Sequence, residues 1–474
     1  MNRLIRAAAR SLSLRFHCSV SPLVASLPGM VSSQLRPQVD RPVLLRWLAA
    51  GLLASDLIGT LPLQALPIQA GAKTASAALS MAATPPSQSI PGAGAGEGAF
   101  DPSHYTPAIL RLSFTSMVKA GATPTAADSF VDLILIPPEG EPIGRRSAVT
   151  TADFASLLKQ LYSQLSRQEP LNVDDAQSPA RQLYRILFEP LAADLQRLGI
   201  TTLLISADQG LQAVPFAALH DGRSYLGERL AFSLTPSLAL TPLSLPVRGP
   251  QRQVAVGASQ FDGLAALPLV PQEVNRVEGA KGETYLNRAF TPELLLAKAG
   301  DPNVNRLHVA THAEFLPGGP AKARLFTGTE PLSLASFASL RQRRSGVLLD
   351  LIALSACRTA LGDRDSELGF AGLALQAGSR SAIGTLWYVD DVATSAFFVQ
   401  FYRYLDAGLP KAEALEATRS AMAQGRIRLV SDHIVGPRGD ILLDNLTPAQ
   451  QRRIGAGMRH PFFWAGVTLL GTPW

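Results

Sequence analysis

The chain has 474 residues, of which 47% are hydrophobic and 17% are charged, so it can bury a large core and is not an intrinsically disordered protein. Its net charge of +6 is concentrated at the start, because residues 1–60 hold seven arginines against two aspartates and leave only +1 for the rest. A nucleic-acid-binding domain normally has a basic face in its folded part, so nucleic acid is not an expected partner.

The first residues are expected to direct the protein to its destination rather than to fold. Residues 1–80 combine arginines with an apolar stretch from Trp47 and small residues at 75–77, a pattern typical of a secretory signal. Asp56 and two prolines interrupt the stretch, so no stable membrane span is expected. We therefore expect an exported or membrane-associated protein. Two alternatives stay open: Met30 as the true start, and an apolar tail on a cytoplasmic protein.

Residues 81–107 are rich in Ala, Gly, Pro and Ser, and such a segment buries too little apolar surface to order itself, so we expect a linker. From residue 108 onward, apolar runs typical of strands alternate with amphipathic segments typical of helices. The expected strands cover 131–138, 201–208, 253–259, 306–313, 347–357 and 381–387, and the clearest helices cover 152–167, 178–199 and 370–378. Nearly continuous apolar strands are buried on both faces, which predicts an α/β fold: a parallel sheet with helices on both faces.

The expected helix at 178–199 carries its own start, break and stop signals. Ser178 and Pro179 suit the N-cap and the first helical position. Pro190 is expected to break the helix, and Gly199 to end it.

Two neighbouring strands end in reactive side chains. His312 lies where the strand 306–313 ends, and Cys357 ends the strand 347–357, 45 residues later. That interval is long enough for one crossover connection. If the two strands are adjacent and parallel, imidazole and thiol meet at one edge of the sheet, where functional groups of parallel α/β sheets collect.

This pair has the residue types of a nucleophile and its base. A free thiol with a pKa of about 8.5 is ionised to only a few per cent at neutral pH, and a neighbouring imidazole raises the thiolate fraction. Backbone N–H groups of Ala313 and Cys357 are the candidate donors to an oxyanion. Two alternatives remain: Cys357 as an inert core residue, and His308, inside the strand, as the relevant histidine. We expect His308 to be a core residue.

The segments that carry these residues resemble the CHAT family of caspase-like and separase-like peptidases. The resemblance rests on 204–222, 226–238 and 267–277, and continues through "RLHVATHAEF" (306–315), "LSACRTALGD" (354–363), "AGSRSAIGTLWYVDDVAT" (377–394), 401–408 and 460–471. It implies a caspase-like fold in which a degenerate caspase-like subdomain (108–250) precedes a catalytic one (251–474). It also implies a His–Cys dyad, carried here by His312 and Cys357.

One position departs from the family pattern. The family favours glycine directly after the catalytic histidine, and this chain has Ala313. If that turn requires a positive φ, alanine costs about 1 kcal/mol in strain and shifts the N–H that serves the oxyanion.

Two carboxylates, Asp390 and Asp391, follow the strand at 381–387. The segment resembles the part of separase around the pocket for a basic residue, and acidic groups there would bind Arg or Lys by charge-assisted hydrogen bonds. The alternative is that one of them caps the following helix. Asp208 and Gln209 follow the strand 201–208 and are further candidates for substrate contact.

The sequence thus predicts a cysteine endopeptidase acting on protein or peptide substrates through His312 and Cys357, with cleavage after a basic residue as a finer hypothesis. The main alternative is a non-catalytic CHAT module that binds or senses a regulatory partner in a larger assembly; another acyl transferase on the same scaffold is a third. Cys18 and Cys357 are the two cysteines, and no Cys/His set has zinc spacing, so no metal is expected. No glycine-rich phosphate loop is present either, and no cofactor is expected.

Overall fold

The computed structural model describes residues 107–117, 125, 128–208, 210–235, 237–238, 241, 252–279, 282–315, 322–356, 369–388 and 390–474. The expected leader, the expected linker up to residue 106 and Cys18 lie outside the described residues. Cys357 and Gln209 also lie outside them.

Among the described residues, most strands are short and apolar, and several run between helices. The strands are β1 (Pro107–Ser116), β2 (Ser129–Ile136), β3 (Ile143–Ala148), β4 (Thr202–Ala207), β5 (Ala231–Thr235), β6 (Gln253–Gly257), β7 (Glu283–Leu286), β8 (Arg306–Ala310), β9 (Ala313–Phe315), β10 (Ala323–Phe326), β11 (Pro331–Ser333), β12 (Leu349–Ser355), β13 (Ser379–Thr385), β14 (Arg428–Val430), β15 (His433–Val435), β16 (Ile441–Leu443) and β17 (Val467–Gly471). The α-helices are α4 (Thr151–Ser166), α5 (Pro179–Leu187), α6 (Ala192–Arg197), α7 (Val270–Val277), α8 (Pro292–Gly300), α9 (Leu340–Arg343), α10 (Gly369–Gln376), α11 (Asp391–Asp406), α12 (Lys411–Ala423) and α13 (Pro448–Arg453). The 3-10 helices are η2 (Glu189–Leu191), η3 (Phe216–Ala218), η4 (Leu226–Glu228), η6 (Asn287–Ala289), η8 (Leu334–Ser339) and η9 (Pro461–Phe463).

One large sheet organises the described part of the chain. Its eleven strands lie in the order β3-β2-β1-β4-β5-β17-β13-β12-β8-β6-β7, and two small three-stranded sheets, β11-β10-β9 and β14-β15-β16, lie outside it. Seven of the ten neighbouring pairs are parallel; β1–β2, β2–β3 and β13–β17 are antiparallel. The expected α/β fold is confirmed, with a sheet that is mostly rather than wholly parallel.

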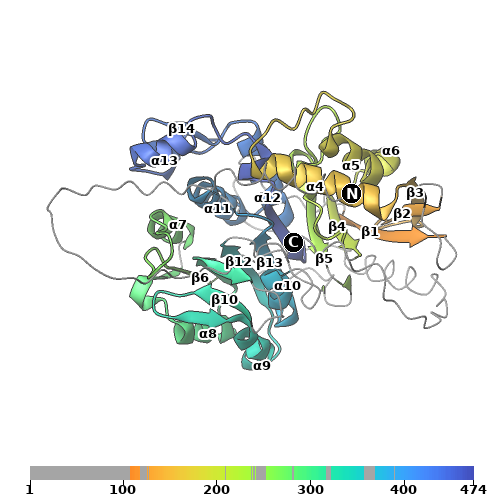
Figure 1. Ribbon diagram of the computed structural model, residues 1–474. Helices are drawn as coiled ribbons and strands as arrows, with labels where there is room; N and C mark the ends of the chain where they lie inside the picture. Colours follow the sequence, from red (N-terminus) through yellow and green to blue (C-terminus); the bar gives the residue numbers. More distant parts are fainter. Residues whose placement is uncertain are drawn as a thin grey trace, which may run out of the picture. The chain divides into compact units, whose positions relative to one another are not determined.

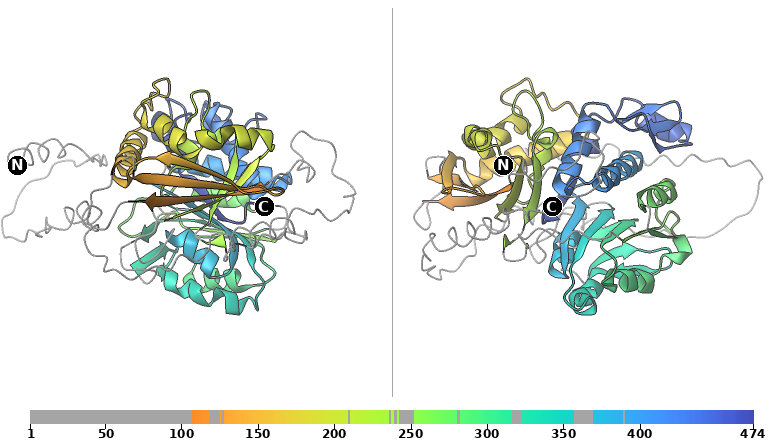
Figure 2. Two further views of the ribbon diagram at one scale, coloured as in Figure 1. Left: turned by 90° about the vertical axis from the view of Figure 1, so that its right-hand side faces the viewer. Right: turned by 180° about the vertical axis from the view of Figure 1, so that it is seen from behind.

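Helices cover both faces of this sheet, as its apolar strands require. In Figure 1, α7 and α11 lie on one face of the strands β6 and β12, and α8, α9 and α10 lie on the other. Figure 2 shows the same two layers of helices with the sheet between them. Strands β6 and β5 are buried along their whole length, and β12 is buried at six of its seven residues. Burial on both faces explains why these strands are continuous apolar runs rather than alternating ones.

The break expected within residues 178–199 is confirmed. Ser178 is the N-cap of α5, Pro179 follows it, and Pro190 lies in the short η2 that separates α5 from α6. Proline cannot donate the backbone hydrogen bond that a continuous helix needs at that position. Gly199, with φ of 60°, ends α6 in the left-handed conformation that glycine adopts at low cost.

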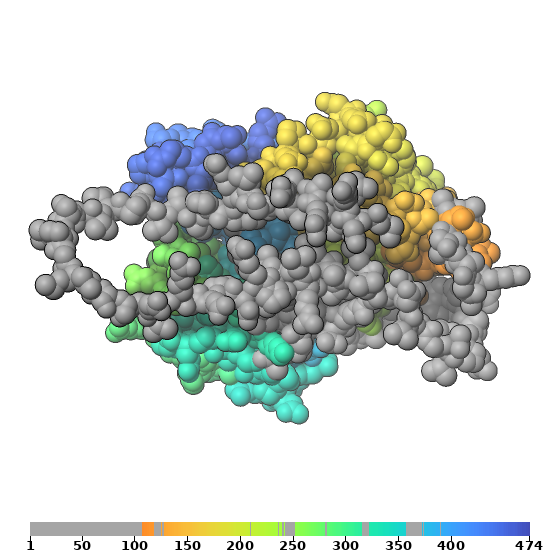
Figure 3. Space-filling view, in the orientation of Figure 1, coloured from red at the N-terminus to blue at the C-terminus, as the bar shows by residue number. Residues whose placement is uncertain are grey.

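The C-terminal strand β17 joins the two halves of the sheet. It lies parallel to β5 and antiparallel to β13, so the strands on the β5 side and those on the β13 side run in opposite directions. The C-terminal segment also touches the N-terminal half, because the His460 Nε2–H donates to the Glu169 carbonyl at 2.9 Å. In Figure 3 this blue segment lies beside the yellow segment that includes α4.

Helix α12 covers this joint and buries charged side chains there. Glu413 accepts a hydrogen bond from the Thr202 hydroxyl, and among the described residues its Oε2 is buried without a hydrogen-bond partner. Burial raises the pKa of Glu413 to about 7, and burial also raises the pKa of Glu416 to about 7 against the opposing charge of Arg419. Such a carboxyl has a higher pKa in the folded chain than in the unfolded chain. As the pH rises from the unfolded-state pKa to the folded-state pKa, the unfolded chain loses the proton first, and the free energy of unfolding falls.

The substitution Glu413→Gln is therefore expected to stabilise the protein at pH 8, by on the order of 1 kcal/mol, and to change little at pH 4.5. Glutamine mimics the protonated carboxyl in shape but carries no charge to bury. Thermal unfolding of both proteins from pH 4.5 to pH 8 checks this. A variant that is less stable than the wild type at pH 8 would contradict it. The pKa of Glu416 is raised as well, so the variant keeps part of the fall in stability with rising pH.

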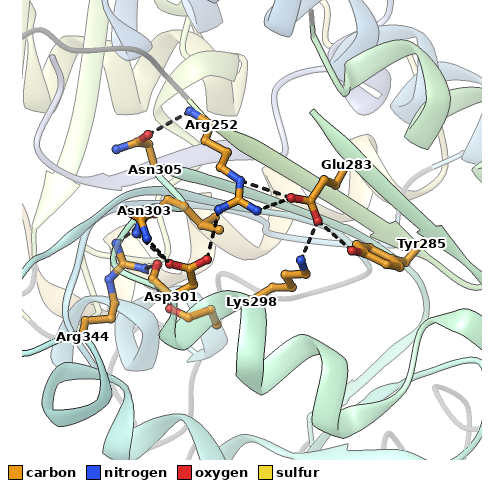
Figure 4. A network of polar contacts seen from close by, with 10 residues as sticks. Arg252, Glu283, Tyr285, Lys298, Asp301, Asn303, Asn305 and Arg344 are labelled. Atoms are coloured by element: carbon orange, nitrogen blue, oxygen red, sulfur yellow. Dashed lines mark hydrogen bonds and ion pairs between the residues drawn. The ribbon is translucent and has the colours of Figure 1, made fainter. Parts of the chain in front are cut away.

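Charged side chains also gather where β6, β7 and β8 begin (Figure 4). Arg252 bonds Glu283 and reaches Asp301 at 3.2 Å, and Glu283 also accepts from Lys298 at 2.5 Å and Tyr285 at 2.7 Å. These donors, Lys298 first, lower the pKa of Glu283 to about 2. The network thus ties the edge strand β7 to α8 and β6 at the amino ends of the strands.

Within the described residues, no helix combines the length and apolar character that crossing a membrane would need.

Candidate active site

The two strands that carry the candidate dyad are neighbours. β8 and β12 pair in parallel with Ala310 opposite Ser355, and the Thr311 N–H extends the ladder by donating to the Ser355 carbonyl at 3.3 Å. His312 lies two residues beyond Ala310, and Cys357 lies two residues beyond Ser355 in the sequence. Cys357 itself is outside the described residues.

The His312 ring is held on two sides and partly exposed. Its Nε2 lies 2.8 Å from the Ala265 carbonyl, and its ring contacts the Phe261 ring with centroids 4.7 Å apart. A carbonyl oxygen only accepts hydrogen bonds, so Nε2 must carry the hydrogen. In the neutral ring this assignment leaves Nδ1 as the basic nitrogen.

The residues that hold His312 belong to the segment after β6. The Leu267 N–H donates to the Ser259 carbonyl at 2.9 Å and closes this segment into a loop. Asn287 anchors the loop, because its Oδ1 accepts from the Ser259 N–H at 2.8 Å. The Ala265 carbonyl is thus part of a hydrogen-bonded loop rather than a free chain.

Ala313 lies in strand β9 and has no positive φ, so the left-handed strain considered for it does not arise. The Phe326 N–H donates to the His312 carbonyl at 3.0 Å, which makes His312 and Phe326 a hydrogen-bonded pair of the antiparallel β9–β10 ladder. The next pair, Ala313 and Leu325, is then a non-hydrogen-bonded pair. The Ala313 N–H consequently points away from β10.

The last described residues of β12 are held from both neighbouring strands. The Thr385 hydroxyl, at the end of β13, donates to the Ala356 carbonyl at 2.8 Å. On the other side, β8 binds the Ser355 carbonyl through Thr311. The chain is thus fixed up to the residue directly before Cys357.

The end of β13 is anchored by a tryptophan. The Trp387 Nε1–H donates to the Phe462 carbonyl at 3.0 Å, and the Tyr162 ring meets the Trp387 ring edge-on at 5.8 Å. A Cβ on Gly466 would lie 2.7 Å from the indole, so only glycine fits this close approach. Tyr388, the next residue, is 64% exposed and is an apolar group available to a substrate at this edge.

Asp390 and Asp391 lie at the start of α11 and both pair with one arginine. Asp390 is the N-cap, accepting from the Val392 and Ala393 N–H groups, which confirms the capping alternative for this residue. Arg453 of α13 reaches Asp390 at 3.1 Å and also pairs with Asp391. Burial, aided by the Asp390 charge and opposed by Arg453, raises the pKa of Asp391.

His308 is a core residue, as expected, and not part of this edge. It is fully buried, its Nε2 lies 2.9 Å from Glu273, and Glu273 in turn accepts from the Ser395 hydroxyl at 2.6 Å. This network joins α7, β8 and α11 beneath the helices.

The strand directions remove Asp208 from the candidate site. β4 runs parallel to β5 and β17, and these strands run antiparallel to β13, β12 and β8. The carboxyl end of β4 therefore lies at the edge where β8 and β12 begin. Asp208 thus lies at the opposite edge of the sheet from His312, and its contact with a substrate stays a prediction.

Four groups near the site were not singled out from the sequence: the Ala265 carbonyl, Phe261, Thr385 and Arg453. Thr385 lies inside the "GTLW" segment that carries the family resemblance, and nothing else in the sequence marks it as a functional residue. Arg453 lies 62 residues from Asp391, with no motif to connect them. Among the described residues, no group of three or more His, Cys, Asp or Glu side chains is arranged to hold a metal ion.

Comparisons with known proteins show to which family the chain belongs. Residues 177–472 match the family model described as the CHAT domain. Two solved structures are similar at low identity: the Arg-specific cysteine proteinase gingipain R (10% identity, TM-score 0.36, covering 67% of this chain and 74% of that one) and the Saccharomyces cerevisiae separase–securin complex (12%, 0.40, 78% and 30%). The chain thus spans less than a third of that separase chain. No curated protein matches it.

Proposed function

We propose that this chain, which belongs to the CHAT domain family, is a cysteine endopeptidase that hydrolyses peptide bonds in protein substrates. The observation that carries the proposal is the parallel pairing of β8 and β12 with Ala310 opposite Ser355. In that register His312 and Cys357 each follow the paired residues by two positions, at the carboxyl edge where parallel sheets bind substrates.

In the proposed mechanism the His312 Nδ1 takes the proton of the Cys357 thiol, and the thiolate adds to the substrate carbonyl carbon. The π electron pair moves to the carbonyl oxygen, which the N–H groups of Ala313 and Cys357 stabilise. When the carbonyl re-forms, the C–N bond breaks and His312 gives its proton to the leaving amine. A water molecule, deprotonated by His312, then hydrolyses the thioester and regenerates the thiol. The hydrogen bond to Ala265 supports this sequence because it holds the tautomer whose Nδ1 is basic.

The finer proposal is cleavage after a basic residue. Asp391 is the better candidate for the pocket, because Asp390 is committed to the helix cap. Arg453 shows that this pair of carboxylates accepts a guanidinium. A substrate arginine would have to displace Arg453, whose side chain is 49% exposed and so not locked in place.

The test is cleavage of a peptide library by a Cys18→Ser variant, before and after alkylation with iodoacetamide. Cys18 and Cys357 are the two cysteines of the chain, so Cys357 is then the sole thiol. We expect cleavage enriched after Arg and Lys that falls to background after alkylation.

Cleavage that survives alkylation would rule out the cysteine mechanism. A protein that cleaves nothing, and whose Cys357 reacts only after heating, would favour the non-catalytic CHAT module. Cleavage without preference for basic residues would remove the pocket proposal alone.

A further inference from the structure

Three parallel strands end side by side where His312 lies. β7 pairs in parallel with β6, and β6 pairs in parallel with β8, so all three strands reach the same edge of the sheet. Asn287 directly follows β7, Ser259 follows β6 by two residues, and His312 follows β8 by two residues. The segments that continue these strands are therefore in a position to support one another.

The side chain of Asn287 fixes the loop that holds the His312 ring. Its Oδ1 accepts two hydrogen bonds from Ser259, one from the backbone N–H at 2.8 Å and one from the hydroxyl at 3.0 Å. Ser259 is only 6% exposed, so water competes little for these bonds. The Ser259 carbonyl closes the loop 259–267, and this loop supplies the Ala265 carbonyl that lies 2.8 Å from the His312 Nε2.

The backbone of Asn287 lies against a second support of the same histidine. A Cβ on Gly328, in the turn between β10 and β11, would collide with the Asn287 carbonyl, so this turn approaches Asn287 as closely as only glycine allows. Phe326, at the end of β10, donates its N–H to the His312 carbonyl at 3.0 Å. Asn287 thus contacts both the loop that holds the His312 ring and the hairpin that holds the His312 backbone.

Asn287 meets two local requirements at once. Its backbone is left-handed, with φ of 50°, a conformation that asparagine and aspartate adopt more readily than most residues with a side chain. Its short side chain also ends in the acceptor that binds Ser259. We propose that Asn287 is a positioning residue that keeps the His312 ring in the tautomer whose Nδ1 is basic. This inference rests on the proposed function, since it takes His312 as the catalytic base.

The inference predicts which kinetic constant depends on Asn287. Without the asparagine side chain, Ser259 loses the acceptor of its two bonds, and the Ala265 carbonyl no longer holds the His312 Nε2–H in one place. A ring that turns or changes tautomer accepts the thiol proton less well, which slows the chemical step rather than the binding of substrate. Because a misplacement of about 1 Å can cost about 10²-fold in rate, we expect a loss of about 10–100-fold in kcat.

The experiment compares Asn287→Gly, which allows the left-handed backbone and removes the acceptor, with Asn287→Asp, which keeps both. For each variant, kcat and KM are measured on a peptide substrate, and ¹⁵N NMR of histidine-labelled protein gives the tautomer of each neutral ring. His312→Ala identifies the His312 signals. His308 reports the fold in the same spectra, because it is fully buried and paired with Glu273 in the core.

We expect Asn287→Gly to lower kcat about 10–100-fold with KM within about twofold, and to turn the single Nε2–H tautomer of His312 into a mixture. The His308 signals should stay as in the wild type. Asn287→Asp should keep the single tautomer and most of kcat, because aspartate offers the same acceptor. Asn172→Gly is the matched control, since Asn172 is an exposed asparagine with φ of 46° between α4 and α5, and it should change neither quantity.

A wild-type kcat in Asn287→Gly would overturn the inference, as would a lower kcat with the His312 tautomer unchanged. Altered His308 signals would show that Asn287 supports the core as a whole, and a low kcat in Asn287→Asp would show that the acceptor is not what matters; both results also overturn the inference. Each of these leaves the proposed function standing, because the wild type still cleaves. A wild type that cleaves no peptide would overturn the proposed function and this inference with it, since Asn287 would then position no base.

Discussion

Replacing either Cys357 or His312 by alanine is expected to lower kcat/KM at least about 10³-fold, and replacing both is expected to cost no more than the larger single loss. The reason is that the two side chains act in one step: the imidazole is useful only to a thiol that it ionises, and the thiol is weak without it. Residues that act as a unit in this way are strongly non-additive. The strand register supports a common step, because both residues follow the paired Ala310 and Ser355 by two positions.

The measurement is kcat/KM of the two single variants and the double variant on the best library substrate. His433→Ala is the matched control, because His433 is a partly exposed histidine paired with Asp432 in the separate β14–β15–β16 sheet. It should retain full activity. Losses that multiply in the double variant would show independent roles for the two side chains and would contradict the dyad.

Much of the fold was predictable because local signals and tertiary structure agree. A strand that is apolar along its whole length is typical of a parallel sheet covered on both faces. Strands β6, β12 and β13 appear where such runs occur in the sequence. The break at Pro190 follows from backbone chemistry alone. From the sequence, the adjacency of β8 and β12 was a condition that one crossover-length interval allowed, and the structure meets it.

Strand order and direction were not predictable in the same way. Nothing local to residues 467–471 indicates that β17 lies between β5 and β13, because both partner strands are distant in the sequence and β5 is more than 200 residues away. The antiparallel β13–β17 pair is what reverses the direction of the β4 side and places Asp208 at the opposite edge of the sheet from His312. Side-chain partners such as Arg453 for Asp391 depend on the same long-range arrangement.

The charged network and the candidate site lie at opposite ends of β8 and β12. The candidate site collects at the carboxyl ends of β8 and β12, whereas the charged network of Figure 4 lies where β6, β7 and β8 begin. Arg344 belongs to that network and is fully buried, yet its guanidinium bonds backbone carbonyls rather than a carboxylate. The acceptors are the carbonyls of Val347 (2.9 Å), Ala299 (2.9 Å), Asp301 (2.6 Å), Val304 (2.9 Å) and Leu348 (3.5 Å).

The substitution Arg344→Met is therefore expected to destabilise the protein by roughly 3–5 kcal/mol, because it leaves several buried carbonyls without a donor. These carbonyls belong to the end of α8 and to the segments that lead into β8 and β12, so one side chain fixes where both strands begin. Arg344→Lys should recover part of the loss, since an ammonium has three donors on one atom and cannot reach the spread of acceptors that the guanidinium fork spans.

Chemical denaturation of the wild type, Arg344→Met and Arg344→Lys measures this effect, with Arg343→Met as the matched control. Arg343 is the preceding residue and is exposed, with one bond from its Nε to the Ser339 hydroxyl at 3.1 Å, so its loss should stay within about 0.5 kcal/mol. If Arg344→Met loses no more free energy of unfolding than this control, the buried carbonyls do not depend on the guanidinium. The folded fraction of Arg344→Met should keep a kcat close to that of the wild type, because the substitution lies at the far ends of the strands from His312. A stability loss with kcat preserved is the pattern expected if the amino ends of these strands serve the fold and their carboxyl ends serve the chemistry.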